Sequence, residues 1–354
     1  MFVERFSEKY NIRVASKVQP QIVSRRGLAW IEHPLLARYR WLIHAFTTRR
    51  GGASGGPSAG LNLGFTKGES HARVPKNRDL FFRQLGVEEF AQAALRQVHS
   101  ATIYQVGRAS DGELEYRLGG NLLPGPSGLA RHEGDALLTE EAGIMLEVRT
   151  ADCLPVLLVD TKRRAVAAVH AGWQGALARI VEKTVGEMRR LYGSDPRDML
   201  AVLGPSIRVC CYEVGQEVED AFQGRFLEAD KFFRTRLESS TSHLEDTGKS
   251  ACATSPAGSL SFLNMRPPGH NPSAKPSAHL DLVAVAQAQL REAGLAPHHI
   301  AAADFCTACR PDLFYSHRRE GSGARRMLAV IGIRPRNEPQ RRDLTQPRPV
   351  ANSC

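Results

Sequence analysis

Long apolar segments are missing from this chain of 354 residues. No run approaches the roughly 18 apolar residues that a membrane-spanning helix needs, and the opening stretch MFVERFSEKYNIRVASK has no apolar core like that of a secretory signal. We therefore expect no membrane partner and a cytoplasmic location. A hydrophobic content of 42% and a charged content of 24% are ordinary for an enzyme, so composition excludes fibrous and disordered classes.

Cysteines are few, seven in all. An odd number in a long chain without a secretory signal is typical of reduced thiols rather than of a disulfide framework. Cys210 and Cys211 are adjacent, and Cys306 and Cys309 form a lone CxxC pair. Because adjacent cysteines chelate poorly, the sequence favours ordinary thiols over a structural zinc site at these pairs. A thioredoxin-like role is disfavoured too, since no helix clearly starts at the CxxC.

Motifs for nucleic-acid and nucleotide binding are also absent. The chain has no zinc-finger spacing, no RNP-like aromatic motif, no Walker A loop and no GxGxxG loop opening a helix. The formal net charge of +10 favours anionic ligands, but charge does not choose among nucleic acids, acidic membranes and small phosphates. Charge is thus the only argument for a nucleic-acid binder, and we expect no nucleic-acid partner.

One globular domain with polar additions accounts for the length of the chain. We expect the catalytic domain at residues 28–333, with mobile tails at residues 1–27 and 334–354. Ser, Pro, Gly and Thr dominate residues 237–277, which predicts a polar low-complexity surface insertion.

Periodic apolar residues predict a mixed α/β (α+β) fold. The runs 155–159 and 165–169 flank the charged DTKRR, which predicts a strand hairpin. Helical spacing follows HAGWQG and recurs in LDLVAVAQAQLREAG, and ALLTEEAGIMLEVRTADC predicts a strand, a turn and a strand. The hairpins argue against a purely parallel sheet.

Three candidate metal ligands stand at the ends of predicted apolar strands, namely His99, Cys153 and His170. Two imidazoles and a thiolate suit a zinc site whose fourth position stays open for water or substrate. The residues alone leave two alternatives open: Cys153 as a core thiol with hydrogen-bonded histidines, or Cys153 as a nucleophile activated by a histidine.

Two basic, glycine-containing loops are candidates for binding an anion. Arg49 lies in HAFTTRRGGASGGPSAGLNLGF, and Arg318 and Arg319 lie in YSHRREGSGARRM. Guanidinium groups facing a pocket would bind phosphate through paired hydrogen bonds. A flexible loop and a solvated run of charge are the alternatives.

Ten motifs occur in an order that resembles the YfiH-like, laccase-domain family, also called the polyphenol oxidase or multicopper-like family. They are HAFTTRRGG, LNLGF, RQVHS, GDALLT, TADCLPVLLVD, VHAGWQG, LGPSIRVCCYEVG, HLDL, FCTAC and FYSHRREG. The resemblance implies a single-domain α-β-β-α layered sandwich of the YfiH-like type. It also implies a metal site whose ligands match His99, Cys153 and His170.

Purine nucleoside chemistry is the activity that the resemblance implies. The family phosphorolyses adenosine, inosine and methylthioadenosine, with accompanying adenosine deamination, so the expected partners are purine nucleosides and phosphate. Zinc suits deamination because it lowers the pKa of bound water. Arg49, Arg318 and Arg319 are then expected to bind substrate. Asp152, beside the thiolate, is a candidate to orient a ligand or to move a proton, and a turn or capping role is its alternative.

Other enzyme classes stay open at this point. The family's older name suggests a copper-dependent polyphenol oxidase, although laccases need further copper ligands and no HxH pair occurs here. A Cys/His hydrolase is the other class. Gln174, Ser100 and His317 depart from the usual family residues, which bears on substrate preference and phosphate contacts rather than on the ligands.

Overall fold

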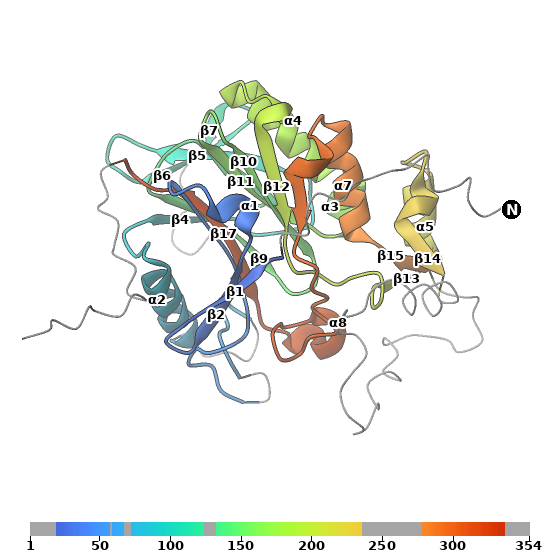
Figure 1. The fold of residues 1–354 in the computed structure, drawn as a ribbon, viewed down its shortest axis with the longest axis horizontal. Coiled ribbons are helices and arrows are strands. Elements are labelled where there is room, and N and C mark those ends of the chain that lie inside the picture. The colour runs from blue at the N-terminus through green and yellow to red at the C-terminus, as the bar shows by residue number, and fades with distance from the viewer. Residues whose placement is uncertain (1–18, 57–58, 67–71, 124–131, 236–277, 337–354) are drawn as a thin grey trace, which may run out of the picture.

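The computed structural model describes residues 19–56, 59–66, 72–123, 132–235 and 278–336 (Figure 1). The predicted insertion at 237–277 lies outside the described residues, as do residues 1–18 and 337–354 of the predicted tails. Two large sheets pack face to face, and helices cover the outer face of each. The predicted α-β-β-α sandwich is therefore confirmed. None of the described helices combines the length and apolarity needed to cross a bilayer.

The larger sheet has eight strands in the order β16-β12-β10-β11-β8-β5-β6-β7. Pairing is mostly antiparallel, with parallel pairs at β12–β16 and β5–β8. The strands are β5 (Ile103–Arg108), β6 (Leu114–Leu118), β7 (Asn121–Leu123), β8 (Ala136–Thr139), β10 (Leu154–Asp160), β11 (Ala165–Ala171), β12 (Met199–Leu203) and β16 (Ile300–Ala302).

The second sheet has six strands in the order β1-β2-β3-β17-β9-β4. Its strands are β1 (Gln21–Arg25), β2 (Leu28–Glu32), β3 (Leu42–Thr47), β4 (Ala91–Ala94), β9 (Ile144–Thr150) and β17 (Met327–Ile333). A small third sheet is formed by β13 (Glu213–Val214), β14 (Phe233–Thr235) and β15 (Ala278–Leu280).

Helices close both sides of the sandwich. The α-helices of the described residues are α1 (Pro34–Ala37), α2 (Arg73–Leu85), α3 (Trp173–Leu177), α4 (Ile180–Tyr192), α5 (Gln216–Gln223), α7 (Leu282–Glu292) and α8 (His317–Glu320). Apolar side chains of α4 and α7 pack on the eight-stranded sheet, and those of α2 pack on the six-stranded sheet. The helical pattern after HAGWQG is split into α3 and α4 because Arg179 adopts a left-handed conformation with φ of 62°.

The central hairpin is the element that the sequence predicted most directly. Strands β10 and β11 pair antiparallel, with Val156 opposite Val169. Leu158 faces the helix layer and Leu157 faces the other sheet, so both faces of β10 are buried. A strand buried on both faces is apolar at every position, which explains the unbroken run LPVLLV.

One expectation needs correction. Residues 21–25, placed in the N-terminal tail, form the edge strand β1, joined to β2 by a tight turn at Arg26 and Gly27, where φ is 46° and 82°. The side chains of β1 are mostly exposed, so no apolar periodicity marked it as a strand. The predicted strand, turn and strand of ALLTEEAGIMLEVRTADC are confirmed as β8 and β9, which belong to opposite sheets.

Candidate active site

Two neighbouring strand ends and a loop bring His99, Cys153 and His170 together. Cys153 directly precedes β10, and His170 lies at the end of β11 on the neighbouring strand. His99 lies in the loop before β5, with a φ of 60°, rather than at a strand end as predicted. The Cys153 Sγ and His99 Nε2 atoms are 3.6 Å apart, and one ligand atom from each residue lies within 4.8 Å of the others.

The donor geometry fits a small tetrahedral metal ion. Zn–N bonds of about 2.05 Å and Zn–S bonds of about 2.3 Å, at tetrahedral angles, place nitrogen and sulfur about 3.6 Å apart. The Cys153–His99 distance has this value. Three protein ligands leave a fourth position for substrate or water, as in catalytic rather than structural zinc sites.

Asp135 organises the triad from behind and was missed in the sequence. Its carboxylate accepts the His170 Nδ1–H at 2.8 Å, the His99 N–H at 3.1 Å and the Ser100 N–H at 2.6 Å. A carboxylate can only accept, so Nδ1 of His170 carries the proton and Nε2 is left to bind metal. The sequence signal was the motif GDALLT, in which an acid directly precedes an apolar run. The structure shows that this acid is fully buried.

Ser100, one of the departures from the family pattern, supports the same carboxylate. Its hydroxyl donates to Asp135 at 2.8 Å. Burial alone would raise the pKa of Asp135, but the hydrogen bond and charge of His170, with the bonds from Ser100, hold that pKa below its usual range. Asp135 is therefore an anion that favours the proton on Nδ1 of His170.

Cys153 and His170 shift each other's protonation. Burial would raise the pKa of the Cys153 thiol, but the charge of His170 and hydrogen bonds from His170 and His99 outweigh burial and lower it to about 6. Burial would lower the pKa of His170, but the Cys153 thiolate and Asp135 outweigh it and raise it to about 9. The thiolate, which is the form that binds metals, is thus favoured at neutral pH.

Asp152 holds three segments together beside the thiolate. Its carboxylate accepts the Thr307 hydroxyl at 2.6 Å, the Ser316 hydroxyl at 3.0 Å and the Arg318 N–H at 2.6 Å. The residue has a φ of 92°, which non-glycine residues rarely adopt. Burial raises the pKa of Asp152 and those hydrogen bonds oppose the rise. These contacts are those of a positioning residue, and a direct catalytic role for Asp152 stays a prediction.

The three arginines predicted to bind substrate donate to groups of the protein. Arg49 lies over the Tyr315 ring at 4.5 Å and pairs with Glu320 at 3.5 Å. Arg319 pairs with Glu320 at 2.7 Å and also donates to the carbonyl oxygens of Thr307, Ala308 and Phe314. Arg318 donates from its side chain to the Glu213 carbonyl at 2.8 Å. Phosphate binding by these residues stays a prediction.

Arg326 is a further cationic group close to the triad. It is partly buried, and burial lowers its pKa while the charges of Cys153 and Asp152 oppose that lowering. Burial and the charge of Cys153 both raise the pKa of the Tyr212 hydroxyl, and the ring of Tyr212 lies 5.5 Å from the Arg318 guanidinium. In the sequence, Arg326 belongs to the basic loop YSHRREGSGARRM, which is a candidate for binding an anion or a solvated run of charge.

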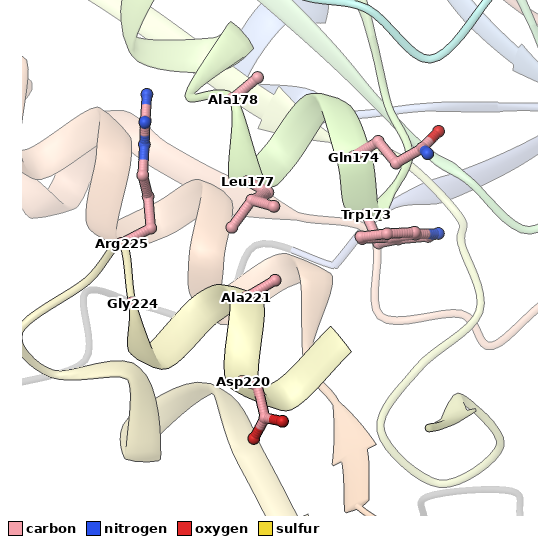
Figure 2. A pocket seen from close by; sticks show the side chains of 8 residues that line it. All are labelled: Trp173, Gln174, Leu177, Ala178, Asp220, Ala221, Gly224 and Arg225. Carbon is pink, nitrogen blue, oxygen red and sulfur yellow. The ribbon is translucent and has the colours of Figure 1, made fainter. Parts of the chain in front are cut away.

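A separate groove of about 500 Å³ lies on the outer side of α3 (Figure 2). It contains no side chain of the triad, although Trp173 follows His170 by three positions in the chain. Gln174, another departure from the family pattern, borders it. The groove is lined by Trp173, Gln174, Leu177, Ala178, Asp220, Ala221, Gly224 and Arg225.

Known proteins resemble this chain over most of its length. Residues 43–254 and 257–334 match the family described as Multi-copper polyphenol oxidoreductase laccase. A protein of Bacteroides thetaiotaomicron named Purine nucleoside phosphorylase is 30% identical over 302 residues, which span 84% of this chain and 94% of the relative. The protein named Adenosine deaminase RL5, from an unknown prokaryotic organism, is 33% identical over 294 residues, spanning 82% and 93%.

Solved structures show the same fold. The crystal structure of the Bacillus licheniformis hypothetical protein YfiH aligns with a TM-score of 0.67 at 26% identity, covering 88% of this chain and 99% of that one.

Proposed function

The chain belongs to the Multi-copper polyphenol oxidoreductase laccase family, as its ordered motifs predicted, and we propose that it is a zinc-dependent purine nucleoside phosphorylase with adenosine deaminase activity. The names of the similar proteins, Purine nucleoside phosphorylase and Adenosine deaminase RL5, support this class of substrate. Adenosine, inosine and methylthioadenosine are the proposed nucleosides, with phosphate as the second substrate of phosphorolysis.

One observation carries the proposal: His99, Cys153 and His170 present their ligand atoms within 4.8 Å of one another. Asp135 sets the tautomer of His170, which leaves Nε2 free as a ligand. Zinc, when bound there, would supply Lewis-acid chemistry that suits deamination at neutral pH.

Phosphorolysis needs an anion site, and we assign Arg326 to it beside the predicted Arg49, Arg318 and Arg319. Arg326 interacts electrostatically with Cys153 and donates from Nη1 to the carbonyl oxygens of Ala324 and Arg325, whereas Arg49 and Arg319 pair with the carboxylate of Glu320. A guanidinium group that burial has partly desolvated binds a phosphate oxygen more strongly than one in water.

A second candidate function rests on the same geometry. Cys153, His170 and Asp135 form a thiol, imidazole and carboxylate series, with His170 bonded to Asp135 at 2.8 Å. Such a series activates a cysteine nucleophile in hydrolases and acyl-transfer enzymes. The two functions differ in whether the protein needs a metal.

The copper oxidase alternative has less support from the described residues. Within them, groups of three or more His, Cys, Asp or Glu side chains placed to share a metal are two: the triad, and a cluster of Cys210, Cys211, Cys306 and Cys309. A multicopper oxidase needs additional copper sites with histidine ligands.

Product analysis tests the proposal. Purified full-length protein is incubated with adenosine, inosine or methylthioadenosine and phosphate, and free base, ribose 1-phosphate or its methylthio analogue, and inosine are separated by chromatography. We expect phosphate-dependent release of base, and inosine from adenosine without phosphate. Absence of product from every purine nucleoside would refute the proposal, and oxygen-dependent phenol oxidation with stoichiometric copper would favour the oxidase.

Two matched variants test whether the activity belongs to the triad. His170→Ala should lose the activity, and His298→Ala should keep it. His298 is exposed and lies in the turn after α7, so its loss should leave activity unchanged. Metal-free wild type that stays fully active and is inactivated by iodoacetamide would instead support the cysteine hydrolase.

A further inference from the structure

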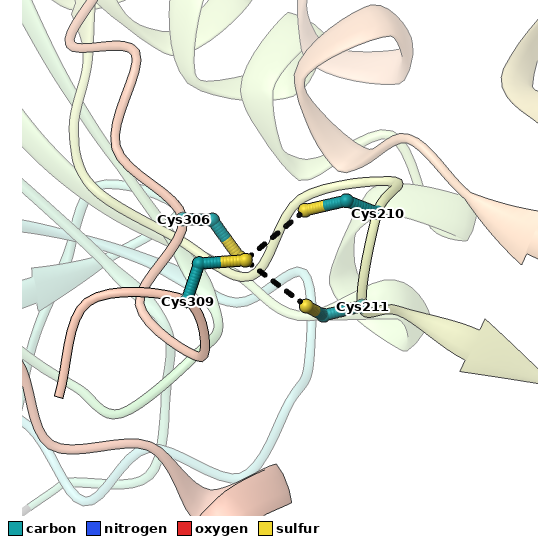
Figure 3. Close-up of side chains that lie close together, drawn as sticks. All are labelled: Cys210, Cys211, Cys306 and Cys309. Carbon is teal, nitrogen blue, oxygen red and sulfur yellow. Dashed lines mark hydrogen bonds between the residues drawn. The ribbon is translucent and has the colours of Figure 1, made fainter. Parts of the chain in front are cut away.

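The fold brings together two cysteine pairs, Cys210 with Cys211 and Cys306 with Cys309, that lie far apart in the sequence. The Sγ atom of Cys309 lies 3.6 Å from that of Cys210 and 3.3 Å from that of Cys211, and all four sulfur atoms, including that of Cys306, lie within 4.8 Å of one another (Figure 3). Four Zn–S bonds of about 2.3 Å at tetrahedral angles place the sulfurs about 3.8 Å apart. The cluster therefore has the size of a tetrahedral four-thiolate site.

Two turns explain how adjacent cysteines can serve as ligands here. The Cys211 N–H donates to the Arg208 carbonyl at 2.8 Å, and the Arg310 N–H donates to the Cys306 carbonyl at 3.2 Å. These turns present both thiols of one pair toward the CxxC pair (Figure 3). The prediction of ordinary thiols was based on each pair alone, because the sequence does not show that the two pairs lie side by side.

A short bridge fixes the two turns side by side. Ser206 pairs in parallel with Cys306: the Ser206 N–H donates to the Phe305 carbonyl at 3.3 Å, and the Thr307 N–H donates to the Ser206 carbonyl at 3.0 Å. Backbone bonds, rather than the thiols themselves, therefore bring the pairs together. A site positioned in this way needs little rearrangement to bind an ion.

We propose that Cys210, Cys211, Cys306 and Cys309 bind a structural zinc ion, at a site separate from the triad. Four protein thiolates complete a tetrahedral shell and leave no position for substrate, which is the pattern of structural rather than catalytic zinc. Cys306 is buried and Cys210 is exposed, so the ion reaches the site from the surface at the Cys210 turn.

The ion would brace one wall of the active site. Thr307, next to Cys306, donates to Asp152 at 2.6 Å, and Asp152 precedes Cys153. Tyr212, next to Cys211, packs its ring 5.5 Å from the guanidinium group of Arg318, whose backbone N–H donates to Asp152. Loss of the ion is thus expected to loosen both turns, lower stability and lower activity indirectly, without removing the metal of the triad.

Metal counting separates the two sites. The full-length protein and its variants are purified under anaerobic conditions and analysed for zinc, iron and copper by elemental analysis. Wild type is expected to hold about two zinc ions per chain, one at each site, and Cys153→Ser and Cys309→Ser about one each. A Cys153→Ser protein that holds no zinc even after loading with zinc would overturn the proposal, whatever the nucleoside assay shows. Iron or copper in place of zinc would overturn the zinc assignment.

Cobalt(II) replacement identifies the ligands directly. In the Cys153→Ser background the four-cysteine cluster is the thiolate site that the described residues offer, so thiolate-to-cobalt charge-transfer absorption reports on it. Cys309→Ser should abolish most of this absorption, whereas Cys309→His should retain a weaker band because Cys₃His also binds tetrahedral metals. If Cys309→Ser does not fold, the Cys309→His comparison still decides. A disulfide between the pairs in anaerobically purified protein, seen by peptide mass spectrometry, would contradict the site.

Discussion

Replacing Asp135 by Asn tests how the triad is held. The carboxylate accepts from His170, His99 and Ser100, and at 3.3 Å from the Val98 N–H, so both oxygens are occupied by donors. Asparagine keeps the shape but offers one oxygen and an NH₂ group, which must face a donor on one side. If it faces His170, Nδ1 must become an acceptor and Nε2 takes the proton, which prevents Nε2 from binding metal.

The size of the effect follows from these contacts. Loss of a carboxylate that orients a metal-binding histidine typically costs 10- to 100-fold in metal affinity, or about 1.4 to 2.7 kcal/mol. Stability without metal should also fall, by about 3 to 5 kcal/mol, because a buried and paired charge is removed while its donors remain. Asp135→Asn should thus weaken zinc binding in a competition with a chromogenic chelator and shift the urea unfolding midpoint downward.

The matched control is Asp220→Asn. Asp220 lies on α5 at the outer groove, away from the triad, so its substitution should leave zinc affinity unchanged. Zinc affinity of Asp135→Asn within about twofold of wild type, with nucleoside activity retained, would refute the assignment of Asp135 as the residue that orients His170.

Further predictions concern the space, charge and protonation of other residues. Gly172→Ala should abolish zinc binding at the triad without unfolding the protein: an added Cβ would lie 2.6 Å from His99 Cδ2, while the backbone φ of −71° suits alanine. Arg326→Gln should raise the KM for phosphate by about 10- to 100-fold, the loss of one charge-assisted hydrogen bond, and leave deamination, which uses no phosphate, nearly unchanged. Burial and the nearby His33 lower the pKa of His44 from 6.5 to about 3, so His44 stays neutral in the fold. As pH falls, the unfolded chain binds a proton at this residue before the folded chain does. The contribution of His44 to the free energy of unfolding, up to about 4 to 5 kcal/mol, is therefore present above pH 6.5 and is lost as pH falls toward 3. In urea unfolding, His44→Gln should flatten this dependence of stability on pH.

Each of these has a result that contradicts it. Gly186→Ala, where an added Cβ meets nothing within 4 Å, is the control for Gly172→Ala. Equal zinc content in the two variants would show that the space between Gly172 and His99 accommodates a methyl group. An equal loss of both activities in Arg326→Gln would show that the residue is structural. A wild-type stability that falls with pH in parallel with that of His44→Gln would show that His44 does not stay neutral.

Local patterns predicted the centre of the fold and the candidate ligands. The β10–β11 hairpin follows from two apolar runs and a charged turn, and Cys153 and His170 follow from their places at strand ends. Each of these patterns involves residues that are close together in the sequence, so recognising it does not require knowledge of how distant segments pack.

Contacts between distant segments were beyond such patterns. Asp135 is separated from His99 and His170 by more than thirty positions each way, and only the parallel pairing of β5 with β8 and the antiparallel pairing of β8 with β11 bring them together. Cys210 and Cys309 are likewise 99 positions apart. Contacts in the folded chain were also needed to recognise that Arg49 and Arg319 donate to Glu320 and to backbone carbonyl groups.

Zinc titration of metal-free protein tests the central claim most directly. With the four-cysteine cluster filled first, phosphorolysis of inosine should return in proportion to zinc bound at the triad and reach its maximum at about one ion per triad. Cys153→Ala protein, titrated in the same way, should stay inactive while retaining its fold by circular dichroism. Full activity in metal-free wild type, or in Cys153→Ala, would contradict the account.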